Sequence, residues 1–238
     1  IIISMIGVIP AAGRGKRLGR ISEEIPKPLV EIRGKTLLER CIESLKKHDI
    51  NEIVIIVGYK KEKIIDFLNS KNFGTKIKIL EQKEQKGLAH ALLQLDGIKD
   101  SMLVRLPDNI IDGDYSYLIK KFKKENPDFI QLFRNRDNPN DNTPTLIIKK
   151  DNILDIIKGY NGEDGFRGVP IYIIKPIFFK YCKELMQNLK EGEELKETMV
   201  MKKMIDDGRK MMAVRFLGRL IDITTDKDIE NAKWYQIF

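Results

Sequence analysis

Apolar runs of strand length alternate with amphipathic stretches through the first half of the chain. The apolar runs lie at residues 5–10, 52–58, 76–80 and 101–107. Apolar residues recur at helical spacing at residues 35–49, 60–70, 87–98 and 115–126. Because largely apolar strands separated by helices are typical of parallel sheets, this half is predicted to form a parallel sheet with both faces covered.

The pattern changes after Pro127, where the connections become short or polar. Strands are expected at residues 128–133, 143–150, 152–157, 168–174 and 219–224, and helices at 177–189, 196–207 and 226–235. Short connections favour antiparallel pairing. We therefore expect an α/β fold with a Rossmann-like mixed sheet, mostly parallel, with helices on both faces and a smaller antiparallel subregion. The chain shows no linker or internal repeat, which predicts a single domain over residues 1–238.

The composition is that of a soluble globular protein, with 42% hydrophobic and 33% charged residues. The apolar runs are far shorter than the roughly 20 residues that span a bilayer. The first residues lack a basic region and a small-residue cleavage site, so they are expected to form a strand rather than a signal peptide. Cys41 and Cys182 are far apart and belong to no CxxC motif. They are predicted to be buried thiols of a cytoplasmic protein without a membrane partner.

The formal net charge of +8 raises the question of a nucleic-acid partner. The basic clusters at residues 59–63, 119–126 and 147–151 are scattered and diluted by acidic residues. None has the interleaved aromatic residues of a single-strand binding surface. A lysine-rich solvated surface and small anionic substrates account for the charge, and a nucleic-acid binder with steep salt dependence is the alternative.

Residues 11–15 follow the first predicted strand directly, and four of these five residues are Ala or Gly. Ala11, Ala12, Gly13 and Gly15 would let backbone N–H groups approach phosphate oxygens at the carboxyl end of the sheet. The dinucleotide fingerprint is excluded because it needs Gly at position 18, and the P-loop is excluded because it needs Gly at position 10. Taken alone, the segment fits a phosphate-binding loop and a turn that feeds a helix equally well.

The loop continues as G-x-G-x-R-L and is followed by P-K-P-L, which places Arg17 and Lys27 ten residues apart. This arrangement resembles the signature of the sugar-1-phosphate nucleotidyltransferases. Four more segments resemble family motifs in the same order, at residues 81–92, 103–110, 169–176 and 220–232. The resemblance implies a nucleotide-binding half at about residues 1–126 and an acceptor-binding half on the sugar side at about residues 127–238.

The reaction that the resemblance implies is the attack of a sugar-phosphate oxygen on the α-phosphorus of a nucleoside triphosphate, with release of pyrophosphate. Such a reaction depends on positioning and charge neutralisation and needs no covalent nucleophile. Arg17 offers a fork of donors for the departing pyrophosphate. Lys27, held between Pro26 and Pro28, would bind the sugar phosphate. The alternative for both cations is ordinary surface charge.

Asp108 and Asp222 follow strand-like runs within two of the matched segments. The resemblance implies that they are metal ligands, and Mg²⁺ binds through one or two carboxylates together with substrate phosphates. Mg²⁺ is therefore the expected cofactor. The alternatives are a turn residue for Asp108 and a helix cap for Asp222.

Gln82 and Gly87 lie in the segment that resembles the base-binding part of the family. A side-chain amide can accept from N3–H of an imide and donate to its carbonyl, which favours UTP or dTTP. Gly87 would leave room for the base. The alternative for Gln82 is an exposed loop residue, and His90 is expected to serve packing or helix-start hydrogen bonding.

Lys158 and Tyr172 are the candidate acceptor-binding residues because they occupy family positions on the sugar side. Pro107, Pro170 and Thr224 stand where the family usually has Gly. These departures leave open a cytidylyltransferase that acts on a phosphorylated alcohol, and a catalytically weak nucleotide-binding regulatory homologue. The expected partners are a nucleoside triphosphate and a phosphorylated sugar or alcohol, and the sequence leaves open whether the chain forms a homo-oligomer.

Overall fold

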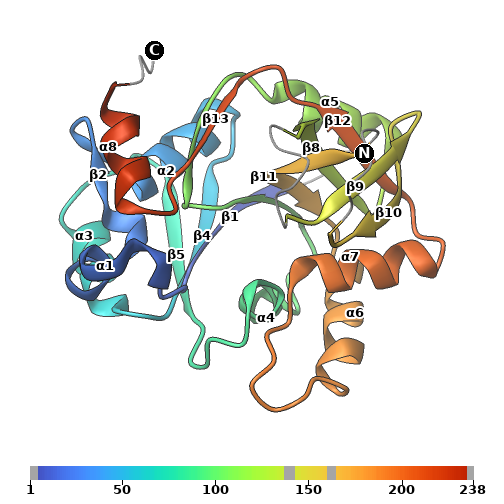
Figure 1. Cartoon of the computed structure of the whole chain (residues 1–238), viewed down its shortest axis with the longest axis horizontal. Helices are drawn as coiled ribbons and strands as arrows, with labels where there is room; N and C mark the ends of the chain where they lie inside the picture. The colour runs from blue at the N-terminus through green and yellow to red at the C-terminus, as the bar shows by residue number, and fades with distance from the viewer. Residues whose placement is uncertain (1–4, 137–142, 160–164, 235–238) are drawn as a thin grey trace.

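The computed structural model describes residues 5–136, 143–159 and 165–234, and its central feature is a mixed sheet (Figure 1). Among these residues the sheet has nine strands in the order β5-β4-β1-β6-β11-β8-β12-β10-β9. In chain order they are β1 Met5–Ala11, β4 Glu52–Val57, β5 Lys76–Glu81, β6 Ser101–Arg105, β8 Phe129–Asn135, β9 Thr145–Lys149, β10 Asn152–Ile157, β11 Phe166–Ile174 and β12 Met211–Arg215. Two small ribbons pair β2 Glu31–Ile32 with β3 Lys35–Thr36, and β7 Asn109–Asp112 with β13 Arg219–Asp222.

Helices cover both faces of the sheet, as the alternation of apolar strands and helices predicts. The α-helices are α1 Gly19–Glu24, α2 Leu37–Lys47, α3 Lys61–Asn69, α4 Leu88–Leu92, α5 Ser116–Glu125, α6 Ile177–Met186, α7 Glu197–Asp206 and α8 Asp226–Trp234. Three short 3₁₀ turns are η1 Lys16–Leu18, η2 Lys27–Leu29 and η3 Leu93–Leu95. Successive residues of β4 point to opposite faces, so Ile55 packs under α2 and α3 while Ile56 packs with α4 and its neighbours. This is why the strand is apolar throughout.

The sheet is mixed rather than mostly parallel. Strands β5, β4, β1 and β6 are parallel to their neighbours in this group, and β8 is parallel to β12. The other five pairings that the structure describes within this sheet are antiparallel. Sequence reasoning missed β12, whose five residues MMAVR carry no turn signal and no clear period. It also missed β7, because Asn109–Asp112 belongs to a turn-like segment and becomes a strand only through its pairing with β13.

Two local features follow from side-chain chemistry. Helix α2 begins with a capping box, in which Glu39 N–H donates to Thr36 Oγ1 and Thr36 N–H donates to the Glu39 carboxylate. Pro170 lies within β11 where the pairing with β8 is irregular between Gly168 and Tyr172. Because proline has no N–H to give to a ladder, an irregular position of this kind accommodates it.

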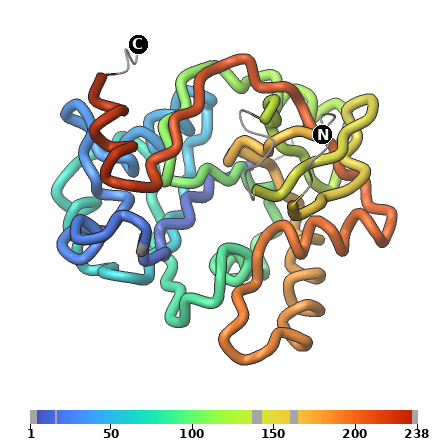
Figure 2. Tube along the Cα trace, in the orientation of Figure 1, coloured from blue at the N-terminus to red at the C-terminus, as the bar shows by residue number. Residues whose placement is uncertain are grey.

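A separate apolar cluster joins the N-terminal loop region to the C-terminal segment. Leu18, Ile32 and Ile110 pack with Ile223 and Ile229 in this cluster. Figure 2 shows the C-terminal segment running beside the first helices of the chain. Residues near positions 17, 27, 108 and 222 are thereby brought to one end of the sheet.

The other helices and strands expected from the sequence are present, with ends that differ by a few residues. Cys41 and Cys182 are buried free thiols. The helix expected at residues 87–98 is only α4 followed by the turn η3, and Tyr235 of the last predicted helix lies outside the described residues. In the part of the chain that the structure describes, every helix is too short or too polar to cross a membrane.

Candidate active site

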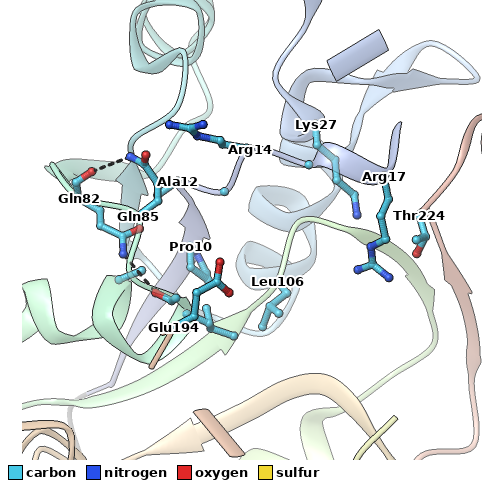
Figure 3. Close-up of a pocket in the computed structure, with 15 residues that line it drawn as sticks. Pro10, Ala12, Arg14, Arg17, Lys27, Gln82, Gln85, Leu106, Glu194 and Thr224 are labelled. Atoms are coloured by element: carbon cyan, nitrogen blue, oxygen red, sulfur yellow. Dashed lines mark hydrogen bonds between the residues drawn. The ribbon is translucent and has the colours of Figure 1, made fainter. Parts of the chain in front are cut away.

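A cavity of about 590 Å³ opens beside the loop that follows β1, and we call it the loop cavity. It is lined by seven of the residues predicted from the sequence, namely Ala12, Gly13, Gly15, Arg17, Lys27, Gln82 and Gly87. Figure 3 shows Arg17 and Lys27 pointing into one end of the cavity beside Thr224, with Gln82 and Gln85 at the other end. Ala11 is different, because it is the last residue of β1 and is buried in the core. Arg17 and Lys27 thus mark one end of the cavity, which we call the cationic end, and the two glutamine side chains lie at the other end.

The glycines that line the loop cavity have different reasons to lack a side chain. A Cβ on Gly13 would meet no protein atom within 4 Å, so its side-chain direction is open space. Gly15 has a φ of +63°, and a Cβ there would lie 3.1 Å from the Cβ of Lys27. Gly87 has a φ of +100°, and a Cβ would lie 2.5 Å from the carbonyl oxygen of Leu195. The close neighbour of Gly87 is therefore the Leu195 backbone, and space for a base is not needed to explain this glycine.

These differences predict opposite consequences for two substitutions. Gly87→Ala should lower the free energy of unfolding by about 1–3 kcal/mol or more, because strain of φ is added to a backbone clash. Gly13→Val should leave stability nearly unchanged but raise the KM for the nucleoside triphosphate about tenfold or more, because the new side chain would occupy the space that the sequence predicts for phosphate. Thermal unfolding and steady-state kinetics on both variants test this. Equal effects of Gly13→Val on KM for both substrates would argue against a triphosphate at this loop.

Lys27 is fixed between the loop and a carboxylate. Its side chain is 12% exposed, and Nζ lies 3.6 Å from Oδ2 of Asp108. Burial lowers the pKa of Lys27 and the positive charge of Arg17 lowers it further, while Asp108 opposes the shift. The ammonium group is therefore incompletely compensated by the protein. A bound anion in the loop cavity would stabilise its charged form.

Asp108 and Asp222, although far apart in sequence, lie side by side. In the ribbon of β7 and β13, Asp222 is opposite Asn109, and Ile223 N–H donates to the carbonyl oxygen of Asp108 at 3.0 Å. Both aspartates line a cavity of about 200 Å³, which we call the carboxylate cavity. Nη2 of Arg167 donates to Oδ2 of Asp222 at 2.5 Å, so each carboxylate has one protein cation beside it.

This pair has the donor chemistry that Mg²⁺ prefers. Two hard carboxylate oxygen groups face one cavity, and Mg²⁺ commonly takes one or two carboxylates and completes its shell with water and substrate phosphates. Within the described ranges no group of three or more His, Cys, Asp or Glu side chains forms a self-sufficient metal centre. The residues therefore fit an ion that is held jointly with a phosphate ligand.

Arg105 supports the turn that carries Asp108. Its side chain is buried, with 1% exposed, and it donates to Oδ1 of Asn109 at 2.6 Å and to the Asn109 carbonyl oxygen at 3.1 Å. Asn109 in turn donates from Nδ2 to Oδ1 of Asp108 at 2.7 Å. A buried guanidinium thus orients the amide that orients the carboxylate.

The structure places the two predicted acceptor residues apart. Lys158 lines a third cavity of about 850 Å³ beside α7, which we call the α7 cavity. Tyr172 lies in the core, 2% exposed, with its ring stacked on Phe129 and its pKa raised well above the usual range by burial. This placement does not support the predicted contact between Tyr172 and an acceptor. Glu197 lines both the α7 cavity and the carboxylate cavity, and burial raises the pKa of its carboxyl group.

Several charged or polar residues that line these cavities were not singled out from the sequence. Arg14, Gln85 and Glu194 line the loop cavity, and Arg167 lines the carboxylate cavity. Arg14 could have been noticed, since it lies between the two glycines of the loop. Gln85, Glu194 and Arg167 have no spacing signal in the sequence, because their positions depend on contacts between distant segments.

Comparison with known proteins gives matches over the whole described fold. Residues 6–144 match the family described as Nucleotidyl transferase. The chain is 32% identical over 234 residues to the UTP–glucose-1-phosphate uridylyltransferase AglF of Haloferax volcanii, covering 96% of this chain and 95% of that protein. It is also 32% identical over 236 residues to the bifunctional protein GlmU of Methanococcus maripaludis, but there it covers 96% of this chain and 53% of the relative. The chain thus spans nearly all of the first relative and about half of the second.

Two solved structures have the same fold. A putative glucose-1-phosphate thymidylyltransferase from Bacillus anthracis, solved with a sucrose, is 25% identical and superposes with a TM-score of 0.84 over 97% of this chain and 94% of that chain. A UDP-glucose pyrophosphorylase in complex with UDP-glucose is 21% identical and has a TM-score of 0.81, with 98% of this chain and 97% of that chain covered. The second likeness concerns the fold alone.

Proposed function

The chain belongs to the nucleotidyl transferase family, and from this premise we propose that it transfers a uridylyl or thymidylyl group from UTP or dTTP to a sugar 1-phosphate. The products would be a nucleoside-diphosphate sugar and pyrophosphate. The observation that carries the proposal is that the loop cavity and the carboxylate cavity adjoin at Leu106, and that Lys27 of the loop cavity lies 3.6 Å from Asp108 of the aspartate pair. The named activities of the similar proteins point to the same reaction.

The loop after β1 is assigned to the triphosphate. Gly13 leaves its side-chain direction open, so backbone N–H groups of the loop can approach phosphate oxygens without a Cβ between them. Arg17, exposed at the cationic end of the cavity, is assigned to the β- and γ-phosphates. Its planar fork suits the oxygens that gain charge as pyrophosphate departs.

Lys27 and Arg167 are assigned to the acceptor phosphate. They reach the aspartate pair from the two adjoining cavities, Lys27 toward Asp108 and Arg167 toward Asp222. A sugar phosphate placed between them would have its charge reduced before it meets the α-phosphate, which lowers the repulsion between two anions. The α7 cavity with Lys158 adjoins this point through Glu197 and is assigned to the sugar ring.

Asp108 and Asp222 are assigned to Mg²⁺. When bound, the ion would neutralise phosphate charge and align the reacting groups. Asn109 and Arg105 keep the Asp108 carboxylate in place, and Arg167 does the same for Asp222. In this assignment residues 1–126 supply most of the nucleotide site and residues 127–238 most of the acceptor site.

The experiment that tests this proposal is a pyrophosphate-release screen. Purified protein with Mg²⁺ would be offered UTP, dTTP, CTP, ATP and GTP, each with glucose 1-phosphate, other sugar 1-phosphates, choline phosphate and inositol phosphate. We expect turnover with UTP or dTTP and at least one sugar 1-phosphate. Turnover confined to CTP with an alcohol phosphate would identify a cytidylyltransferase. Nucleotide binding without pyrophosphate release from any pair would identify a regulatory homologue.

A further inference from the structure

The side-chain amide of Gln82, at the end of the loop cavity away from Arg17, is held by two partners. Nε2 donates to the carbonyl oxygen of Gly87 at 3.1 Å and lies 2.8 Å from Nδ1 of His90. Gln82 is 3% exposed, although it lines the cavity. Figure 3 shows the Gln82 side chain pointing down from the neighbourhood of Gln85 toward the floor of the cavity.

These partners fix which way the amide faces. A backbone carbonyl oxygen can only accept, so the amide nitrogen and not the amide oxygen must face Gly87. The second N–H of the amide then points to His90, whose Nδ1 must accept it. His90 must therefore be the neutral tautomer that carries its proton on Nε2. Burial, with a smaller contribution from Lys86, lowers the pKa of His90 and favours that neutral form, against the opposing influence of Glu84.

The carbonyl and the main chain around this contact are themselves anchored. Gly87 O also accepts from Ala91 N–H at 3.0 Å, inside α4. Leu195 N–H donates to Lys86 O at 2.7 Å, and Ala89 N–H donates to Leu195 O at 3.1 Å. Gln82 N–H donates to Val57 O at 2.8 Å. The amide therefore cannot turn over by a simple shift of its neighbours.

With both N–H groups used, Oε1 is what the Gln82 side chain offers to a ligand. Among the residues that the structure describes, Oε1 has no hydrogen-bond partner. We propose that His90 is a specificity-determining positioning residue, which locks Gln82 so that a hydrogen-bond acceptor faces the base and thereby selects an imide edge, uracil or thymine, over cytosine. The inference rests on the proposed function. It also corrects the expectation that Gln82 both accepts and donates, because its donors are already engaged.

The fixed orientation of the Gln82 amide distinguishes the two kinds of pyrimidine because their hydrogen-bonding edges differ. Uracil and thymine carry a hydrogen on N3, which can donate to Oε1. Cytosine has an unprotonated N3, so two lone pairs would face each other unless the amide turned over. Turning over would direct the Gln82 amide oxygen at the Gly87 carbonyl oxygen and at the lone pair of His90 Nδ1, which leaves the amide oxygen without a donor and is unfavourable for a buried group. CTP is therefore disfavoured as long as Gly87 O and His90 Nδ1 hold the Gln82 amide in this orientation.

Two substitutions of His90 separate this role from simple packing. His90→Phe keeps a planar ring but removes the acceptor, whereas His90→Asn can place its Oδ1 near the position of Nδ1 and keep the amide in place. We expect the ratio of kcat/KM for UTP to that for CTP to fall about tenfold or more in His90→Phe and to stay within about threefold of the original in His90→Asn. The fall should come from better use of CTP as well as poorer use of UTP.

The assay is pyrophosphate release with UTP and CTP at fixed glucose 1-phosphate, with circular dichroism and thermal unfolding to confirm that each variant is folded. If His90→Phe does not fold, His90→Leu, which is smaller and also lacks an acceptor, takes its place. An unchanged UTP-to-CTP ratio in the variant without an acceptor, or an equal fall in His90→Asn, would overturn the inference. If the unaltered protein turns over neither triphosphate, the proposed function itself fails, and that outcome is distinct from an unchanged ratio.

Discussion

Replacing Asp108 by Asn is expected to lower the rate of pyrophosphate release by about a hundredfold to a thousandfold, the usual cost of removing one charge-stabilising group from an active site. Asparagine has the same shape, so it can still accept the hydrogen bond from Asn109, and the fold should be unaffected. What is lost is the negative charge that faces Lys27 and that we assign to the metal. The measurement is the steady-state rate as a function of Mg²⁺ concentration.

Asp112→Asn is the matched control for this prediction. Asp112 ends the same strand, β7, and lines none of the three cavities. It should keep the rate within about twofold of the original, in line with the small effects of surface substitutions. If Asp108→Asn turned over at the original rate when Mg²⁺ is limiting, the assignment of Asp108 to the metal would be wrong.

The second large effect is expected when either of the two cations Arg17 and Lys27 in the loop cavity is removed. The two substitutions should change different kinetic constants. Lys27→Met keeps the aliphatic stem that packs against Gly15 but removes the charge. It should raise the KM for the sugar phosphate about tenfold to a hundredfold, because a hydrogen bond to a charged group contributes about 1.5–3 kcal/mol. Arg17→Ala should mainly lower kcat by a similar factor, because its charge is needed most as pyrophosphate departs.

Kinetics with each substrate varied in turn check this distinction. Arg219→Ala serves as the control for loss of a cation, since Arg219 is exposed at the start of β13 and lines none of the three cavities. If both variants changed the two KM values and kcat alike, Arg17 and Lys27 would have no separate roles.

The parts of the candidate site that could be predicted from the sequence follow strands directly and lie in segments that resemble family motifs. Gly13, Gly15 and Arg17 follow β1 directly, and strand ends at the carboxyl edge of a sheet are where ligands bind. Asp108 and Asp222 follow apolar runs in the same way, and the ribbon of β7 and β13 brings them together. For these residues, the pattern along the sequence and the folded structure indicate the same location at the ends of strands.

The residue positions that could not be predicted from the sequence depend on strand register and on how far a residue lies from the end of its strand. Arg167 and Asp222 are 55 residues apart in the sequence, and their side chains form a hydrogen bond in the folded chain. Their strands pair with different neighbours, β11 with β8 and β13 with β7. Gly168 and Pro170 line the carboxylate cavity, but Tyr172, two residues further along β11, already lies beneath the helices. The distance of a residue from the end of its strand determines whether the residue lines a cavity or is buried in the core. The pattern of apolar residues in the sequence does not indicate this distance.

The direction of the Gln82 amide is a similar case. The sequence shows a glutamine near a glycine and a histidine, but not that Gly87 O and His90 Nδ1 both face Nε2. That arrangement depends on the backbone of residues 86–89 being clamped to Leu195. A preference that rests on two hydrogen bonds therefore needs the folded chain before it can be argued.

Attack of a sugar 1-phosphate on the α-phosphorus of the nucleotide can be tested with UTP that carries a label on one phosphorus atom. Protein, Mg²⁺ and glucose 1-phosphate would be incubated with UTP labelled at the α- or at the γ-phosphorus, and the products separated. We expect the α-label to move into UDP-glucose and the γ-label into pyrophosphate, with neither label released when the sugar phosphate is omitted. Transfer of the γ-label to the sugar, or release of α-label as UMP without an acceptor, would contradict this expectation.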